Sequence, residues 1–273
     1  DGLAIFLSQS GETMDTLSAL RLCREQDQKI LSIVNVPNSS IARESDVVLQ
    51  TLAGPEIGVA STKAFTTQLV VLACLAITAA KQRKTLDTQT EALLSQAITG
   101  IPSRCVEVLN HDKHILRLAQ GLFKARDALY LGRGTGYPIA MEGALKLKEI
   151  SYIHAEGYPA GEMKHGPIAL VDEHLPIVAL VPRGALFEKM MSNLQEAKAR
   201  GGTMIVVSDA KEEAFREVLN LKQDALITVP TTHPLLTPTL MVIPLQLLAY
   251  HIAVLRGCDV DQPRNLAKSV TVE

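Results

Sequence analysis

Apolar and polar residues alternate along this chain in blocks that predict strands followed by helices. The run Leu3–Leu7 is entirely apolar and ends in the polar stretch Ser8–Thr13. Beyond it, apolar residues recur at three- and four-residue steps to about Glu25, a spacing typical of an amphipathic helix. The chain is therefore predicted to open with a buried strand, a polar turn and a helix.

The next part of the chain continues this alternation. Strands separated by helical segments are typical of βαβ units with a parallel sheet. The apolar run Leu69–Ala80 is too short to span a bilayer, so we interpret it as a buried helix. The predicted elements are strands at Ile30–Val34 and Val47–Leu49, a short helix from Ser39 to Glu44, and a long helix to about Lys81 that Ser61 or Thr62 caps.

The rest of the chain repeats this order of elements. Strand, turn, helix and strand at Leu3–Val34 recur at Pro176–Val207, and each half ends in a long apolar helix. We predict two similar three-layer α/β/α sandwiches with parallel sheets. They comprise a first domain over residues 1–85 that lacks its opening elements, a second domain over 86–257, and a tail over 258–273. The predicted elements are helices at Thr88–Ile98, Pro102–Phe123, from about Pro138, Leu186–Arg200 and Thr239–Leu255, and strands at Asp127–Leu131, Pro176–Val181, Thr203–Val207 and Leu226–Val229.

The composition narrows the classes of function. Net charge is −2, aromatic residues make up 4% and Trp is absent, so the chain carries neither the basic footprint nor the stacking residues of a nucleic-acid binder. The cysteines lie far apart and form no metal-binding spacing, so we interpret them as reduced thiols of a cytosolic protein. They are Cys23, Cys74, Cys105 and Cys258.

The turn Ser8–Thr13 has two interpretations. Its hydroxyls, the Gln9 amide and the permissive backbone of Gly11 precede a helix whose first N–H groups are unpaired, and these are the parts of a phosphate site. Alternatively, Ser10 or Thr13 only caps the helix. From this stretch alone the cap is favoured, because capping is common.

A second glycine-bearing turn, Gly132–Gly136, follows the predicted strand Asp127–Leu131. It reads Gly-x-Gly-x-Gly, whereas a dinucleotide-binding loop needs the third glycine one residue later and an acidic residue at the end of the next strand. We therefore predict a tight strand-to-helix turn.

Three charged residues share one face of the helix that follows. Glu142, Lys146 and Glu149 are spaced i, i+4 and i+7. They can form a solvated ion-pair face, or a carboxylate base beside a cation that tunes its proton affinity. Periodicity alone favours the solvated face.

The segment His154–Pro167 is predicted to be a loop dense in titratable groups. His154, Glu156 and His165 could be metal ligands, but no His pair at helical spacing supports this, so we predict no metal. A loop histidine such as His165 suits proton transfer near neutral pH. In the tail, Lys268 is either a nucleophilic amine or an exposed lysine.

Several stretches resemble a known family. Ser8–Thr13 resembles the signature turn of sugar isomerase (SIS) domains, and Gly58–Gln68 is similar to a second stretch of that family. Glu142–Glu156 and Asp261–Glu273 are similar to the isomerase half of the glutamine–fructose-6-phosphate aminotransferases, or glucosamine-6-phosphate synthases. The resemblance covers essentially the whole chain and implies two SIS domains, one shared active site and no cofactor.

The resemblance also implies a role for each candidate residue. The phosphate of fructose 6-phosphate would be held by Ser8, Gln9, Ser10 and Thr13, with Val59 and Ala267 contributing. A base moves a proton between C1 and C2, and a Schiff base makes the C1 proton more acidic. The matching residues are Glu149 as the base, Glu142 and Lys146 as its supports, His165 for ring opening from a neighbouring subunit, and Lys268 for the Schiff base.

Partners and product follow from the same resemblance. The full-length enzymes make glucosamine 6-phosphate, the first step of amino-sugar synthesis, with ammonia from a glutaminase domain that this chain lacks. We expect a cytoplasmic homodimer that alone yields glucose 6-phosphate at most. The alternative is a catalytically silent SIS module that binds a phosphosugar as a sensor. A metal hydrolase using His154 and His165 is the least favoured.

Overall fold

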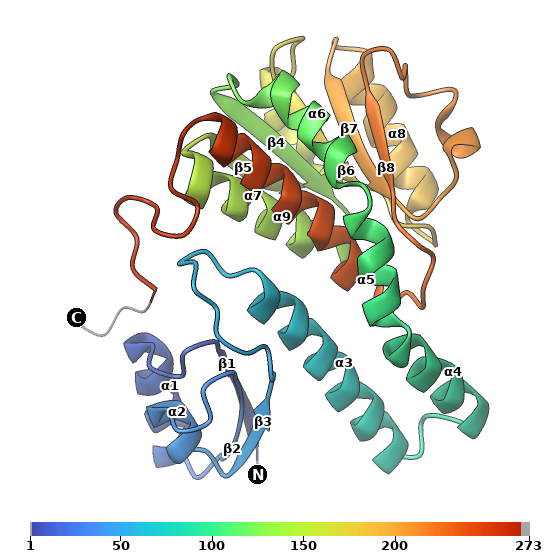
Figure 1. Cartoon of the computed structure of the whole chain (residues 1–273). Coiled ribbons are helices and arrows are strands. Elements are labelled where there is room, and N and C mark those ends of the chain that lie inside the picture. Colours follow the sequence, from blue (N-terminus) through green and yellow to red (C-terminus); the bar gives the residue numbers. More distant parts are fainter. Residues whose placement is uncertain (1, 269–273) are drawn as a thin grey trace. The chain divides into compact units, whose positions relative to one another are not determined.

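The computed structural model describes residues 2–268, which fold into two units. Asp1–Asp87 and the tail from Arg264 form the first unit, and Thr88–Pro263 forms the second. Each unit has its own parallel sheet flanked by helices, which confirms the predicted fold class (Figure 1). The end of the predicted tail, residues 269–273, lies outside the described residues.

The first unit is built on a parallel sheet in the order β1-β2-β3. Apolar side chains from one face of this sheet pack with Leu17 and Leu20 of α1 and Ile41 of α2. The alternate side chains of β1, Leu3 and Ile5 among them, are exposed, as the two-residue period of a strand requires. The elements are β1 (Leu3–Ser8), α1 (Met14–Glu25), β2 (Lys29–Val34), α2 (Ser40–Arg43), β3 (Val47–Gln50) and α3 (Lys63–Gln82).

The parallel register brings the carboxyl ends of these strands to one edge. Ser8 pairs with Val34, and Val34 pairs with Gln50. The turns that leave the strands therefore lie at the edge where open parallel sheets bind ligands.

The long helix α3 is less buried than its sequence predicts. Among the described residues of α3, only Ala64 and Ala73 are buried, so its prediction as a buried helix is wrong. By length and composition, α3 and α9 (Thr237–Leu255) could each cross a membrane. A buried core helix passes the same test, and 61% of the apolar window of α9 is buried within the structure.

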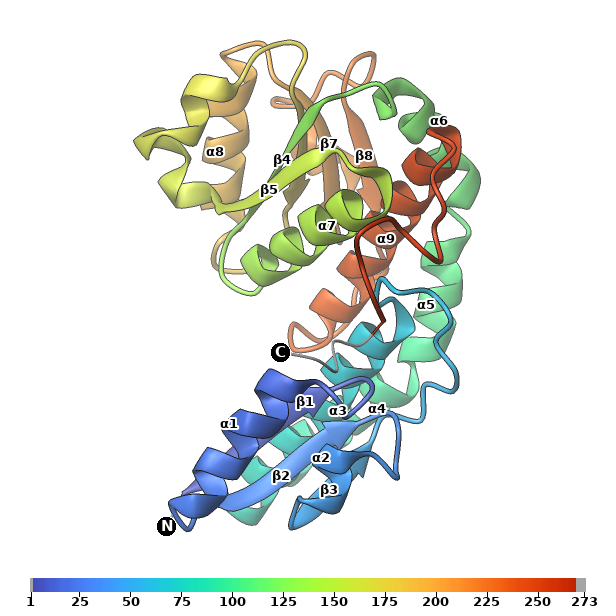
Figure 2. The same ribbon diagram turned by 90° about the vertical axis from the view of Figure 1, so that its left-hand side faces the viewer.

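The second unit has a parallel sheet in the order β5-β4-β6-β7-β8. Figures 1 and 2 show α7 and α9 on one face of the sheet and α8 on the other, so this unit has three layers. The strands are β4 (Asp127–Gly132), β5 (His154–Pro159), β6 (Pro176–Leu180), β7 (Thr203–Ser208) and β8 (Ala225–Thr228). The helices before α9 are α4 (Thr88–Thr99), α5 (Ile101–Leu109), α6 (Asp112–Leu122), α7 (Gly136–Ser151) and α8 (Phe187–Lys198), with short 3₁₀ helices η1 (Ala160–His165), η2 (Pro167–Leu170) and η3 (Glu212–Phe215).

Two predictions for the second unit were wrong. The predicted loop His154–Pro167 contains β5 and η1, because β5 is an edge strand whose polar side chains hid its pattern. The predicted helix Pro102–Phe123 is interrupted between α5 and α6, where Asn110 and His111 stand.

The turn between β4 and α7 is tight, as predicted. A Cβ atom at Gly132 would lie 2.3 Å from the carbonyl oxygen of Gly136 and 2.6 Å from the nitrogen of Tyr137. Both are backbone atoms of the first turn of α7, which cannot move without displacing the helix. Gly134, at the centre of the turn, has a φ of 53°.

We expect Gly132→Ala to lower the free energy of unfolding by about 2–3 kcal/mol, since the added methyl overpacks against fixed backbone. Gly121→Ala is the matched control, because a Cβ there meets nothing within 4 Å in the helix α6. The control should raise stability by about 0.5–1 kcal/mol. Urea unfolding of both variants measures the difference, and equal stabilities would contradict the tight turn.

Candidate functional site

The turn after β1 is shaped by its own hydroxyls. Ser8 Oγ accepts a hydrogen bond from the Gly11 amide at 2.9 Å, and Ser10 Oγ accepts one from the Glu12 amide at 3.2 Å. Thr13 is the N-cap residue of α1, yet its side chain makes no capping hydrogen bond. The interpretation of Thr13 as a side-chain cap is therefore wrong. The amino end of a helix can bind an anion through its first N–H groups.

The turn is also fixed to the start of α2. The Ile41 amide donates to the Gly11 carbonyl at 3.0 Å, and the Ser40 amide donates to Glu12 Oε1 at 2.8 Å. Hydrogen bonds from Ser40, with help from the charge of Arg43, lower the pKa of Glu12 and keep its carboxylate ionised. The turn is thus preorganised before any ligand binds.

Gly11 offers a test of this preorganisation. Its φ is 68°, and a Cβ atom there would lie 1.9 Å from Ser39 Oγ. We expect Gly11→Ala to weaken fructose 6-phosphate binding roughly tenfold, because the backbone strain and the clash displace the turn by more than a binding site tolerates.

Gly54→Ala is its matched control, with the same φ of 68° and nothing within 4 Å of the added Cβ. Titration calorimetry measures both affinities. Equal affinities would show that the turn does not hold the sugar phosphate.

Asn35, which the sequence did not single out, ties this turn to the loop after β3. Its amide N–H donates to the Gln9 carbonyl at 3.2 Å, and its side-chain Nδ2 donates to the Gly54 carbonyl at 2.8 Å. Its Oδ1 accepts from Thr51 Oγ1 at 3.0 Å and from the Ala53 amide at 2.9 Å. An Asn directly after a strand, at the carboxyl edge of the sheet, was the available signal.

Lys268 is held within the first unit rather than exposed on a loose tail. Its Nζ donates to the Gly58 carbonyl at 2.5 Å and lies 3.5 Å from Glu56 Oε2. Gly58 directly precedes Val59, so the lysine lies beside a predicted sugar contact, whereas Ala267 is exposed. The interpretation as a freely exposed tail lysine is wrong.

Glu56 also caps α3. Its Oε1 accepts hydrogen bonds from the amides of Thr62 at 2.7 Å and Ala64 at 3.2 Å. The prediction that a side chain of Ser61 or Thr62 caps this helix is wrong, because Thr62, at the N-cap, makes no capping hydrogen bond and the Ser61 hydroxyl donates to Glu56 Oε2 at 3.4 Å. The sequence gives no sign of this role, since Glu56 lies in an irregular loop six residues before Thr62.

The charged face of α7 is buried in the second unit. Lys146 Nζ lies 2.5 Å from Glu149 Oε2 and 3.5 Å from Glu142 Oε1. The exposed fractions of the side chains of Lys146, Glu142 and Glu149 are 5%, 11% and 22%. The interpretation of these three residues as a solvated ion-pair face, which periodicity alone favours, is therefore wrong.

Burial and charge act together on the proton affinity of Glu142. Burial raises the pKa of Glu142, the charge of Lys146 opposes that rise, and the charge of Glu149 adds to it. Glu149 is closer to the ammonium and more exposed. A carboxylate held beside a fixed cation is an arrangement that can take a proton from a carbon acid and return it.

The two histidines singled out from the sequence, His154 and His165, are both exposed. His165 ends η1, and its side chain has no hydrogen bond or ion pair to another residue between 2 and 268. His154 lies 3.2 Å from Asp127 Oδ1 and 3.3 Å from Glu156 Oε1. In the described part of the chain, no group of three or more His, Cys, Asp or Glu residues could hold a metal ion.

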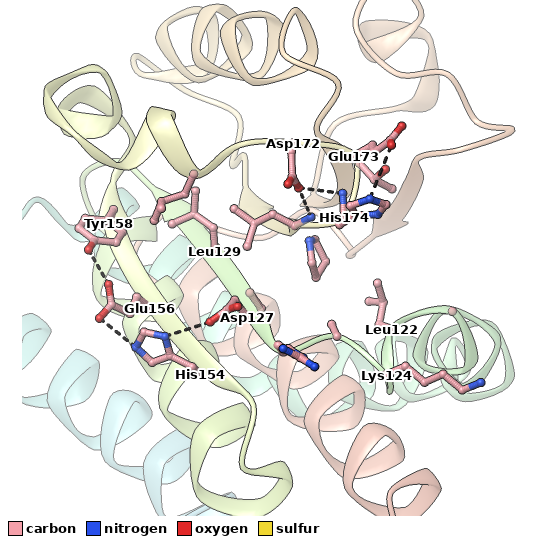
Figure 3. A pocket seen from close by; sticks show the side chains of 18 residues that line it. Leu122, Lys124, Asp127, Leu129, His154, Glu156, Tyr158, Asp172, Glu173 and His174 are labelled. Carbon is pink, nitrogen blue, oxygen red and sulfur yellow. Dashed lines mark hydrogen bonds and ion pairs between the residues drawn. The ribbon is translucent and has the colours of Figure 1, made fainter.

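A cavity of about 860 Å³ lies in the second unit, at the amino ends of β4 to β7 (Figure 3). It is at the opposite edge of the sheet from the usual ligand-binding edge. The acidic side chains around it are already paired. His154 bridges Asp127 and Glu156, and the Tyr158 hydroxyl donates to Glu156 at 2.5 Å, which lowers the pKa of Glu156.

The predicted residues thus fall into separate groups. In the first unit the structure fixes the Ser8–Thr13 turn and seats Lys268 next to Val59. In the second unit it brings together Glu142, Lys146 and Glu149, and it leaves His165 unpartnered among the described residues.

Comparisons with known proteins show the family of this chain. A family model described as the SIS domain matches residues 1–78 and 121–256. The chain is 58% identical over 274 residues to the glutamine–fructose-6-phosphate aminotransferase [isomerizing] of Zymomonas mobilis, and 58% identical over 273 residues to that of Bradyrhizobium diazoefficiens. These alignments cover 100% and 99% of this chain and 44% of each relative, so the chain spans less than half the length of these proteins.

Solved structures show the same likeness. The C-terminal domain of glucosamine-fructose-6-phosphate aminotransferase from Francisella tularensis matches with a TM-score of 0.91 and 48% identity, over 96% of this chain and 72% of that one. A glucosamine-6-phosphate deaminase from Thermotoga maritima matches with a TM-score of 0.78 over 98% of this chain and 75% of that one. At 24% identity, the second likeness concerns the fold alone.

Proposed function

The chain belongs to the SIS domain family, and we propose that it isomerises fructose 6-phosphate as the isomerase part of a glutamine–fructose-6-phosphate aminotransferase. The observation that carries this proposal is the buried Glu142–Lys146–Glu149 cluster. A charge cluster this buried costs desolvation energy, so its presence in a catalyst is better explained by chemistry than by stability.

The Ser8–Thr13 turn holds the sugar phosphate. The side chains of Ser8, Gln9, Ser10 and Thr13, together with the amino end of α1, supply hydrogen-bond donors and a favourable dipole for an anion. Val59 and Ala267 contribute further contacts from the first unit. The phosphate lies several bonds from the reacting carbons, so this turn positions the substrate without taking part in the chemistry.

Glu149 moves the proton. Its carboxylate removes a proton from C1 of the open-chain ketose, and the electrons of that bond form the C1–C2 double bond of an enediol while the C2 carbonyl oxygen takes up a proton. Return of the carbon-derived proton to C2, with loss of the proton of the C1 hydroxyl, leaves the C1 aldehyde of glucose 6-phosphate. Lys146 holds Glu149 in place, and Glu142 shares the same ammonium.

Lys268 activates the ketone. Its neutral amine adds to C2, and loss of water leaves an iminium that makes the C1 protons more acidic. When no ammonia is supplied, water adds back to C2 and releases the lysine, so that glucose 6-phosphate keeps an oxygen at C2. In the full-length protein, ammonia from glutamine then replaces the lysine nitrogen at C2. The same proton shift from C1 to C2 gives glucosamine 6-phosphate.

His165 assists opening of the sugar ring, and we propose that it serves the site of a neighbouring subunit in a homodimer. Its exposed, unpartnered ring among the described residues is compatible with that use. The protein acts in the cytoplasm, in keeping with the free thiols of all the described cysteines.

Borohydride trapping tests the role of Lys268. Incubation with fructose 6-phosphate and borohydride should reduce the iminium to a stable amine, and peptide mass spectrometry should locate the sugar on Lys268. A folded chain that binds the sugar phosphate without forming this adduct would contradict the proposed mechanism.

A further inference from the structure

Glu56 connects the tail lysine to the start of α3. One carboxylate oxygen, Oε1, accepts the amides of Thr62 and Ala64, while the other, Oε2, lies 3.5 Å from Lys268 Nζ. Only 5% of the Glu56 side chain is exposed, against 30% for Lys268. A buried carboxylate that caps a helix needs no cation, so the lysine beside it calls for a separate explanation.

We infer that Glu56 is the positioning residue of Lys268 in the reaction. This inference rests on the proposed function, in which Lys268 Nζ becomes an iminium nitrogen. The amides of Thr62 and Ala64 hold Oε1 of Glu56 in place, and this also fixes the position of Oε2 beside the lysine amine. The Gly58 carbonyl, 2.5 Å from Nζ, is the second acceptor that defines where the amine lies.

The carboxylate also has a role after the amine reacts. When the lysine nitrogen adds to C2 and water leaves, the nitrogen becomes a cationic iminium. Oε2 of Glu56 then faces a positive charge at the reacting centre, and a preorganised opposite charge stabilises it. A neutral side chain of the same shape keeps the helix cap and loses this stabilisation.

Glu56→Gln separates the two roles, because the amide oxygen can still accept the N–H groups of Thr62 and Ala64. The rate of borohydride-trapped adduct formation is measured against fructose 6-phosphate concentration, with the melting temperature as a check on folding. We expect the maximal rate to fall roughly tenfold to a hundredfold, with the half-saturating concentration changed less than about twofold. The melting temperature should stay that of the wild type.

Two further variants serve as controls for this result. Glu56→Ala removes both roles and should lose adduct formation and melt at a lower temperature. Glu44→Gln removes a carboxylate that pairs with Arg21 on the surface of the same unit, and should trap the sugar at the wild-type rate.

The possible outcomes distinguish the positioning role of Glu56 from the role of Lys268 itself. Adduct formation at the wild-type rate in Glu56→Gln overturns the positioning role and leaves the proposed function intact. Absence of an adduct in the wild-type chain overturns the proposed role of Lys268, and the role of Glu56 with it, whereas the proposed isomerisation is tested separately by glucose 6-phosphate formation.

Discussion

Replacing Glu149 by glutamine should lower kcat for the isomerisation of fructose 6-phosphate by about 10³-fold, within the range expected for loss of a general base. Glutamine has the shape of glutamate but accepts no proton. The KM should change little, because the substitution leaves the proposed phosphate-binding turn Ser8–Thr13 unchanged. The measurement is a steady-state assay of glucose 6-phosphate formation.

Glu217→Gln is the matched control for this variant. Glu217 is an exposed glutamate of the same unit and has no ion pair or side-chain hydrogen bond to another described residue. Its variant should keep wild-type kcat. Wild-type kcat in Glu149→Gln would remove Glu149 from the mechanism.

Replacing Lys146 by methionine should lower the free energy of unfolding by about 3–5 kcal/mol at neutral pH. Methionine fills much of the same volume, but it leaves the buried carboxylates of Glu142 and Glu149 without their cation. Activity should be lost as well, since Glu149 is no longer held. Chemical denaturation measures the stability, with the exposed Lys148→Met on the same helix as the control.

The pH dependence of Lys146→Met follows from the sign of the Glu142 shift. Burial already raises the pKa of Glu142 in the folded chain, and Lys146 opposes that rise. Without Lys146 the folded pKa rises further above the unfolded one, so the folded state takes up a proton first as pH falls. The stability deficit should therefore be greatest above this pKa and shrink on acidification.

Adding Glu142→Gln to Lys146→Met should recover part of the lost stability at neutral pH, because one unpaired carboxylate is removed. A deficit independent of pH and unaffected by the second substitution would show that Lys146 contributes packing rather than charge.

The sequence predicted the strands and helices well where hydrophobic periodicity was strong. The prediction failed at β5, because the polar side chains of this edge strand are typical of a loop. It also failed at α3, because an apolar composition predicts a buried helix and most of α3 is not buried. The spacing of Glu142, Lys146 and Glu149 placed them on one face, but periodicity could not show that the face is buried. Burial depends on what packs against α7, and that is a long-range property.

The repeat between the two halves concerns the order of elements and not their chemistry. In the second unit, the turn after β6 carries Arg183, whose amide and Nε lie 2.7 and 3.3 Å from the carboxylate oxygens of Asp209. Its guanidinium also donates to Thr231 Oγ1 at 2.8 Å. The turn after β6 is therefore held by an Arg183–Asp209 pair, a chemistry that the Ser8–Thr13 turn does not share.

Interactions distant in the sequence escaped prediction for the same reason. Glu56 and Lys268 are more than two hundred residues apart, with the sequence separation of Lys268 from Gly58 being 210. Neither lies in a periodic segment, so no local pattern relates them. The role of Lys268 was suggested by family resemblance, while its partner Glu56 emerged only from the fold.

The central claim is that this chain turns over a ketose phosphate and does not merely bind it. The most direct test is a coupled assay that detects glucose 6-phosphate formed from fructose 6-phosphate by the purified chain. The proposed function predicts steady formation of glucose 6-phosphate by the wild type, abolished in Glu149→Gln. Saturable binding of fructose 6-phosphate without any glucose 6-phosphate would contradict it and would indicate a phosphosugar-binding module instead.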